Sequence, residues 1–382
     1  MERESFGAAG RFWMDDEAPA AGGLDPGYAR GSRRRSPWGR RYARPRDDFA
    51  PPDTHARTYA ALDLGTNNCR LLVARPTDTS FRVVDAFSRI IRLGEGVSQT
   101  GRLSEPAIER ALEALAICRD KMHDRGVARA HLIATEACRA ALNGAEFVER
   151  VRQVVGLDLE VINRELEATL AATGCTPLID PEAEGVVLFD IGGGSSEIVL
   201  MGSEPAESGP PLPTMRAWAS LPVGVVVLAE RYGGIAVDRA LFERMVDDVA
   251  QYVRSFAASH LADVSERVHL LGTSGTVTTI AGVHLRLRRY ERRRVDGCWM
   301  LDHEIAQVIE ELLAMDHAAR ADNPCIGPER ADLVLAGCAI LEAIRRAFPS
   351  KRLRVADRGL REGILIQMMR KDRVWSHAAQ ST

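Results

Sequence analysis

From about residue 57 onward, apolar residues follow two patterns: short continuous runs, and single positions that recur at helical spacing. Short apolar runs predict strands, in addition to the hairpin strands considered next, at 81–92, 130–134, 159–162, 269–271 and 352–355. Apolar residues that recur at helical spacing predict helices at 104–125, 145–154, 165–174, 239–260, 303–315, 328–348 and 360–370. Strands and helices that alternate in this way predict an α/β fold in which sheets are flanked by helices.

Two segments repeat one pattern. Tyr59–Pro76 reads YAALDLGTNNCRLLVARP, and Val186–Gly202 reads VVLFDIGGGSSEIVLMG. Each has an apolar run, an Asp, an aliphatic residue, a Gly, a small polar turn and a second apolar run, which predicts a strand, a tight turn and a strand. Such hairpins favour mixed sheets over purely parallel ones. Two unrelated glycine turns are the alternative, but the matched flanks favour two related half-structures.

The hairpin turns have the composition of anion-binding sites. Glycine lets a ligand approach the backbone closely, and successive N–H groups in a turn form an anion-binding concavity. Asp63 and Asp190 place a carboxylate beside each turn, where it suits a hydrated Mg²⁺ ion. Glu197 follows the second turn, and there it could coordinate Mg²⁺ or position water. We therefore expect the two turns to close on one phosphorylated ligand.

Three other segments add candidate chemistry. Residues 270–283 read LLGTSGTVTTIAGV, which predicts a strand, a small-residue turn and a helix whose N-terminus suits a phosphate, unless the turn serves packing alone. Arg139 is predicted at the start of a helix, as a phosphate ligand or a surface ion-pair residue. Glu165 and Glu167 face different ways on a helix, so one can activate water in a cleft, although either can equally be a surface residue.

Composition sets limits on the class of protein. The chain has 382 residues, 46% hydrophobic content and a net charge of -3, which is typical of a soluble globular protein. It contains no apolar stretch near the ~20 residues needed to span a bilayer. The seven scattered Cys indicate reduced thiols and a cytoplasmic location. Residues 1–57 are rich in Gly, Pro and Arg and predict a disordered arm, either a solvated tail or a contact for RNA, anionic lipid or polyphosphate.

Five motifs together resemble the exopolyphosphatase / guanosine pentaphosphate phosphohydrolase family. They are DLGTNNCRLLV, DIGGGSSEIVL, GTSGTVTTIA, PERADLVLAG at 328–337 and VADRGLREGIL at 355–365. That family belongs to the actin-like, sugar-kinase and heat-shock ATPase superfamily. The resemblance covers 58–371 and implies two ribonuclease-H-like domains, 58–180 and 181–373, with a cleft between them, an arm at 1–57 and a tail at 374–382.

The resemblance also implies roles for individual residues, and Mg²⁺ as the cofactor. The catalytic residues would be Glu167, Asp190 and Glu197, and the metal ligands Asp63, Asp190 and Glu197. The phosphate-binding residues would be Asp63, Gly65, Thr66, Asn67, Arg139, Gly192, Gly193, Gly194, Ser195, Ser274, Gly275 and Thr276.

The predicted function is a hydrolase that releases terminal phosphate from inorganic polyphosphate or guanosine pentaphosphate. A small-molecule kinase of the same superfamily and a non-catalytic polyphosphate or alarmone sensor are the alternatives. Three departures from the family pattern bear on substrate choice: Thr169 replaces the Arg usual after EA, VDG at 295–297 replaces VHG, and the chain ends soon after Lys371 without a C-terminal helical domain. Family members often form homodimers, so a homodimer is one expected assembly.

Overall fold

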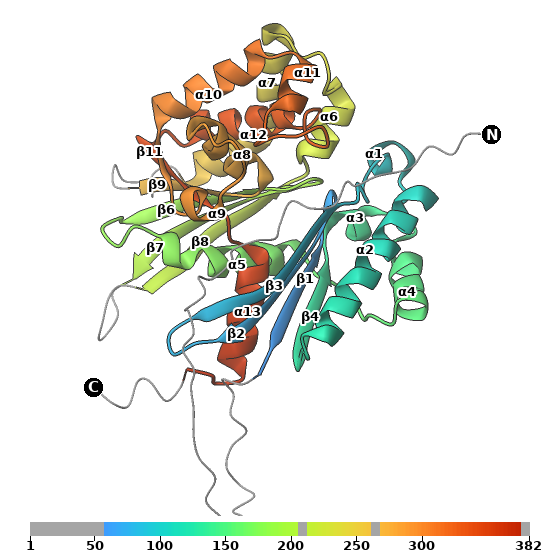
Figure 1. Ribbon diagram of the computed structural model, residues 1–382. Coiled ribbons are helices and arrows are strands. Elements are labelled where there is room, and N and C mark those ends of the chain that lie inside the picture. Colours follow the sequence, from blue (N-terminus) through green and yellow to red (C-terminus); the bar gives the residue numbers. More distant parts are fainter. Residues whose placement is uncertain (1–56, 205–211, 261–267, 376–382) are drawn as a thin grey trace, which may run out of the picture. The chain divides into compact units, whose positions relative to one another are not determined.

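The computed structural model describes residues 57–204, 212–260 and 268–375, and the structural statements below concern these residues. Nearly all of the predicted N-terminal arm, and the end of the predicted tail, lie outside them. The described chain forms two mixed β-sheets flanked by helices (Figure 1), which confirms the predicted α/β class. Among the described helices, none combines the length and apolar character needed to cross a bilayer.

The first sheet contains the first predicted hairpin and has the order β3-β2-β1-β4-β5. The hairpin strands pair antiparallel, whereas β4 and β5 run parallel to β1, so the sheet is mixed. Its strands are β1 (Tyr59–Leu64), β2 (Asn68–Pro76), β3 (Phe81–Ile90), β4 (Arg129–Ala134) and β5 (Glu160–Val161).

Both faces of the first sheet are covered, because alternate residues of its strands are apolar on both sides. Ala60, Leu62 and Leu64 of β1 pack with helices α2 (Glu105–Asp124) and α4 (Gly144–Val154). Tyr59 and Ala61 pack on the opposite face with α5 (Arg164–Cys175) and α13 (Leu360–Lys371). A helix from the end of the chain therefore completes the first sheet, and the predicted domain boundary at 180/181 stays a prediction.

The second sheet contains the second predicted hairpin and has the order β10-β11-β9-β6-β7-β8. The pairs β6–β7 and β7–β8 are antiparallel, while β9 runs parallel to both β6 and β11. Its strands are β6 (Gly185–Ile191), β7 (Ser196–Glu204), β8 (Leu212–Leu221), β9 (Val268–Thr273), β10 (Trp299–Leu301) and β11 (Arg352–Ala356).

One face of this sheet carries the largest apolar cluster of the described chain. The helices that cover it are α6 (Val225–Tyr232), α7 (Arg239–His260), α8 (Gly275–His284), α10 (Asp302–Ala314) and α12 (Val334–Ala347). On the other face, Ala168 and Ala172 of α5 pack against Val186 and Leu188. Helix α5 thus contacts strands of both sheets.

Helices α5 and α13 cross at a distance that only glycine permits. A Cβ atom on Gly174 would lie 1.9 Å from the carbonyl oxygen of Gly359, and one on Gly363 would lie 1.9 Å from that of Leu170. Each clash is with backbone, which cannot move aside as a flexible side chain can. The crossing therefore fixes the position of α5, the helix that carries Glu167.

The predicted helix 328–348 begins six residues late, at Val334, so this part of the prediction is wrong. Residues 328–333 form turns instead, and Arg92 explains why: its guanidinium bonds the Glu329 carbonyl at 3.1 Å and the Asp332 carboxylate at 3.0 Å. A carbonyl oxygen that accepts a hydrogen bond from a distant arginine is less available to accept the N–H bond of a helix. The short helices are α1 (Val97–Thr100), α3 (Glu136–Ala140), the 3₁₀ turn η2 (Thr176–Leu178), α9 (Arg292–Val295) and α11 (His317–Asp322).

Candidate active site

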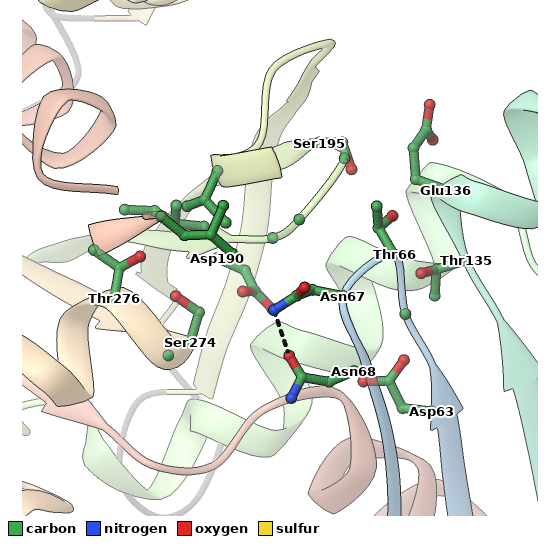
Figure 2. Close-up of a pocket in the computed structure, with 18 of the residues that line it drawn as sticks. Asp63, Thr66, Asn67, Asn68, Thr135, Glu136, Asp190, Ser195, Ser274 and Thr276 are labelled. Carbon is green, nitrogen blue, oxygen red and sulfur yellow. Dashed lines mark hydrogen bonds between the residues drawn. The ribbon is translucent and has the colours of Figure 1, made fainter. Parts of the chain in front are cut away.

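Both predicted hairpin turns open onto one pocket (Figure 2). Asn67 and Asn68 of the first turn lie between Asp63 of the first sheet and Asp190 of the second. The wall contains the two turns, the start of α8, one face of α5 and residues 330–334. The predicted site residues that line it are Asp63, Gly65, Thr66, Asn67, Glu167, Asp190, Gly192, Gly193, Gly194, Ser195, Glu197, Ser274, Gly275 and Thr276. Arg139 is the predicted residue that does not line it, and the roles themselves stay predictions.

The two hairpin turns share one closing geometry. In the first, the Gly65 N–H donates to the Asn68 carbonyl at 2.9 Å, and in the second the Gly192 N–H donates to the Ser195 carbonyl at 3.0 Å. Each bond spans three residues, and each turn follows an Asp by the same interval. The repeated sequence pattern therefore corresponds to a repeated structure.

The turns also approach each other closely. A Cβ on Gly193 would lie 3.2 Å from the Asn67 amide nitrogen, and a Cβ on Gly194 would lie 2.8 Å from Thr66 Oγ1. The Gly-rich sequence of the second turn leaves room for the first. Adjacent backbone amides from both turns therefore border the same small volume, which is the arrangement expected of a phosphate site.

Four carboxylates gather on one side of the pocket, and burial raises the pKa of each. Burial and the nearby Asp63 charge raise the pKa of Asp190 to about 6, and burial raises that of Asp63. Burial and the Asp190 charge raise the pKa of Glu197 to about 7. The Ser195 and Ser220 hydroxyl groups donate to Glu197, each at 2.8 Å, and these hydrogen bonds partly oppose the rise. Burial and the Glu197 charge raise the pKa of Glu167 to about 9. Such clustered, perturbed carboxyls are typical of active sites.

Helix α5 presents Glu167 to the pocket while Glu165 is exposed, as the helical spacing predicted. The Asn163 side chain caps the helix by accepting from the Leu166 N–H at 2.8 Å. Behind Glu167, the Arg139 guanidinium donates to it at 2.9 Å and to Glu136 at 2.7 Å. Arg139 also donates to the Ile162 carbonyl at 2.5 Å, so its donors are used within the protein, and it opposes the effect of burial on the pKa of Glu167.

The pocket wall also holds two arginines that sequence reasoning missed, Arg70 and Arg330. Guanidinium nitrogens of Arg330 and Arg70 lie 3.7 and 3.9 Å from where a Cβ on Gly275 would be. No described acidic residue forms a salt bridge with either arginine. Burial, and then the Arg70 charge, lowers the pKa of Arg330. Arg70 lies inside the first hairpin motif and Arg330 inside PERADLVLAG, so a search of these motifs for basic residues could have identified both.

The start of α8 lies next to these arginines in the pocket wall. Ser274 caps the helix with a φ of 98°, a left-handed conformation that is costly for a residue with a side chain. Its Oγ atom is buried without a hydrogen-bond partner among the described residues, as are Asn67 Oδ1 and Asn68 Nδ2. Unpaired polar atoms that line a pocket indicate a polar ligand.

Comparison with known proteins decides the family. The sequence profile of the Ppx/GppA phosphatase family matches residues 72–372. The chain belongs to the Ppx/GppA phosphatase family. The resemblance read from the motifs is therefore confirmed.

Individual Ppx/GppA relatives agree with this assignment. A Haemophilus influenzae relative is 26% identical over 318 residues, which cover 82% of this chain and 92% of the relative. A guanosine-5'-triphosphate,3'-diphosphate pyrophosphatase from Vibrio parahaemolyticus is 27% identical over 316 residues, covering 81% of this chain but 59% of that enzyme. The chain therefore spans less than two thirds of the length of the latter.

Solved structures of the family share the fold. The Aquifex aeolicus Ppx/GppA family member matches with a TM-score of 0.68 and 29% identity, over 83% of this chain and 98% of that one. An exopolyphosphatase from Cytophaga hutchinsonii matches with a TM-score of 0.74 and 21% identity, over 82% and 98%. At that identity the second match shows the fold alone.

The carboxylates of this family member fit a hydrated cation. Asp63 and Asp190 are hard oxygen donors, and no hydrogen bond from a described residue reaches either side chain. Within the described residues, no three His, Cys, Asp or Glu side chains are placed to enclose a metal. Mg²⁺ does not need such a cage, because it keeps several waters and takes one or two carboxylates plus substrate phosphates.

Proposed function

We propose that the protein hydrolyses the terminal phosphoanhydride bond of inorganic polyphosphate or of guanosine pentaphosphate, with Mg²⁺ as cofactor. One observation carries the proposal: a single pocket joins a phosphate-binding side to a side of four carboxylates. The first side consists of two backbone turns, the α8 N-terminus, Arg70 and Arg330. Phosphoryl transfer needs this combination, because its catalysis is mostly positioning and charge stabilisation.

The turns and the α8 N-terminus would hold the terminal phosphoryl group through backbone N–H groups. Arg70 and Arg330 would contact oxygens of the phosphates that follow, since neither is committed to an ion pair with a described residue. Guanidinium groups suit this task because they bind phosphate oxygens in pairs. The substrate would thus be oriented with its terminal phosphorus toward the carboxylates.

Glu167 would act as the base for the attacking water. The water oxygen bonds to the terminal phosphorus, the bridging P–O bond breaks, and the bridging oxygen leaves with the electron pair. The water proton passes to the Glu167 carboxylate, and the products are orthophosphate and a chain one phosphate shorter. Burial and the negative charges of Glu197 and Asp63 raise the pKa of Glu167, so compensation of these two charges would favour the ionised form that this step needs.

Asp63 and Asp190 are the residues that would hold Mg²⁺, with Glu197 as a water-positioning neighbour already bonded to two serines. Bound there, the ion would neutralise charge on the phosphate oxygens. The serine contacts occupy one oxygen of Glu197, which favours an indirect role for this residue.

The deciding experiment measures phosphate release from polyphosphate and from guanosine pentaphosphate, each with Mg²⁺ and with a chelator. We expect Mg²⁺-dependent release from at least one substrate. A Glu167→Gln variant should bind the same substrate and release phosphate at least about 100-fold more slowly. ADP formation from ATP with an acceptor, and no release from either substrate, would favour the kinase and overturn the proposal.

A further inference from the structure

The loop that follows β3 holds the first hairpin turn in place. We call residues 91–98 the bridging loop; it leads from β3 into α1 (Figure 1). Its Gly94 N–H donates to the Thr66 carbonyl at 2.9 Å, and two further N–H groups of the loop donate to the Asn67 carbonyl at 2.9 and 3.0 Å. A Cβ on Gly94 would lie 2.2 Å from Thr66 Cγ2, so the loop packs directly against the turn. The bridging loop therefore fixes the carbonyl groups of Thr66 and Asn67.

Helix α6 holds the second turn in the same way. The Val225 N–H donates to the Gly192 carbonyl at 2.9 Å, and the Val226 N–H donates to the Gly193 carbonyl at 2.9 Å. A Cβ on Gly224 would lie 2.4 Å from the Gly193 carbonyl carbon, so the helix begins in direct contact with the turn. The N-terminus of α6 therefore fixes two carbonyl groups of the second turn.

The turn amides point away from these supporting contacts. No described peptide bond is cis, and the C=O of a trans peptide and the N–H that follows it point in opposite directions. A carbonyl held on one side of a turn therefore directs the next N–H group to the other side. Three N–H groups directed in this way belong to Asn67, Gly193 and Gly194, which line the pocket and donate to no described residue through these groups. Unpaired amides from two turns thus border one volume, as an anion site requires.

Glu230 connects the two supporting elements. It lies on α6, and its two carboxylate oxygens accept hydrogen bonds from the Gly96 N–H, at 2.8 Å, and from the Ser98 hydroxyl of the bridging loop. None of the described basic residues forms a salt bridge with Glu230, whereas the adjacent Arg231 pairs with Asp248 of α7. The Glu230 carboxylate is therefore used on the bridging loop.

We propose that Glu230 is a positioning residue: by connecting the bridging loop to α6, it keeps the amides of both turns directed at one phosphoryl group. This inference rests on the proposed function and adds to it a residue that does not line the pocket. Amides stabilise the charge that develops on a phosphoryl group only when they already converge on it. Without Glu230 each turn keeps its own supporting contacts, but the two turns can shift relative to each other.

The test uses whichever substrate the wild-type protein hydrolyses, tripolyphosphate or guanosine pentaphosphate. In Glu230→Ala, kcat/KM should fall about tenfold, because hydrogen bonds to a charged group are lost. The dissociation constant of orthophosphate, the product, should rise by a similar factor in calorimetry. The Mg²⁺ concentration that gives half the maximal rate should stay within about twofold, since Asp63 and Asp190 would still hold the ion. A general loss of structure would change all three quantities.

Three further variants separate positioning from charge and from folding. Glu230→Gln should keep kcat/KM within about threefold of the wild type, because its carbonyl oxygen can accept from Gly96 and its amide can donate to the Ser98 oxygen. Ser98→Ala should lower kcat/KM about threefold, and the double variant S98A/E230A should lose no more than Glu230→Ala alone. Arg231→Ala removes the neighbouring charge of the same helix, and it should leave the kinetic constants unchanged even if it lowers the melting temperature.

Several outcomes would overturn the inference. They are a loss below about twofold in Glu230→Ala, an equal loss in Arg231→Ala, or additive losses in the double variant. If Glu230→Ala does not fold, Ser98→Ala decides, and an unchanged kcat/KM in that variant refutes the inference.

Direct binding distinguishes this inference from the proposed function. If the wild-type protein hydrolyses neither substrate, the proposed function fails, and calorimetric binding of tripolyphosphate then decides the role of Glu230. Weaker binding by Glu230→Ala than by Arg231→Ala supports the inference. Equal binding by the two variants, or no binding by the wild type, refutes it.

Discussion

Replacement of Asp190 by Asn should stabilise the fold while it abolishes activity. Asp190 lines the pocket beside Asp63, and burial and that neighbouring charge raise its pKa from 3.8 to about 6. The unfolded chain ionises this carboxyl at lower pH than the folded protein does. The folded form is therefore favoured most at acid pH, and this contribution is lost as pH rises through about 6. Asn keeps the shape of the side chain and cannot ionise.

The magnitude follows from the shift in pKa. A difference of about 2 units corresponds to about 3 kcal/mol, and the half-buried position of Asp190 in the pocket wall reduces this to about 1–2 kcal/mol. At pH 8, Asp190→Asn should therefore have the larger free energy of unfolding by that amount. At pH 4 both proteins carry a neutral side chain in the folded state, so the difference should nearly vanish.

Thermal unfolding followed from pH 4 to pH 8 is the assay. The melting temperatures of the wild type and Asp190→Asn should converge near pH 4, diverge as pH rises to about 6, and then stay apart up to pH 8, with the variant higher. Glu165→Gln, an exposed change on α5, is the control and should show no such divergence. Mg²⁺ should raise the melting temperature of the wild type at pH 8 and have little effect on Asp190→Asn. If Asp190→Asn raised the melting temperature equally at pH 4 and at pH 8, the electrostatic reasoning would be refuted.

Three shorter predictions concern the same pocket. Glu167→Gln should keep affinity for the substrate, measured by equilibrium binding, and lower kcat at least about 100-fold; near-normal turnover would exclude Glu167 as the base. Gly194→Ala would place a Cβ 2.8 Å from Thr66 Oγ1, so kcat/KM should fall while the melting temperature changes little. Arg139→Ala should move the rising limb of the pH–rate profile to higher pH, because this guanidinium opposes the rise in the pKa of Glu167; an unshifted limb with lower kcat would contradict this electrostatic role.

Local patterns in the sequence predicted the parts of the structure that depend on near neighbours. Each hairpin closes within a few residues, so apolar runs, an Asp and glycines suffice to identify it. The helix predicted at 239–260 matches α7 at both ends, because its apolar residues recur regularly along one face. For the same reason the placement of Asp63 and Asp190 at strand ends was predictable, and the pocket confirms that the two strand ends meet.

Long-range contacts explain what the sequence did not show. The segment at 328–333 has a helical pattern, yet Arg92, more than two hundred residues earlier, holds the Glu329 carbonyl and the Asp332 carboxylate. The Arg139 guanidinium is chemically suited to bind phosphate, but it forms hydrogen bonds with Glu136 and Glu167 instead. In both cases the local sequence is compatible with two structures, and a contact with a residue far away in the sequence decides between them.

The arrangement of charge in the pocket has an energetic consequence. Burial raises the pKa of Asp63 and the Arg70 charge partly opposes this effect, yet no salt bridge joins the two described side chains. Asp63 and Arg70 face each other in the register of β1 and β2, so the first sheet holds both residues at the pocket without a direct ion pair. Separated charges in a buried site cost free energy that a direct pair would recover. A ligand whose anionic oxygens contact the arginines, and which brings water or a cation to the carboxylates, removes this cost. Substrate binding should therefore stabilise the protein in proportion to the negative charge of the substrate.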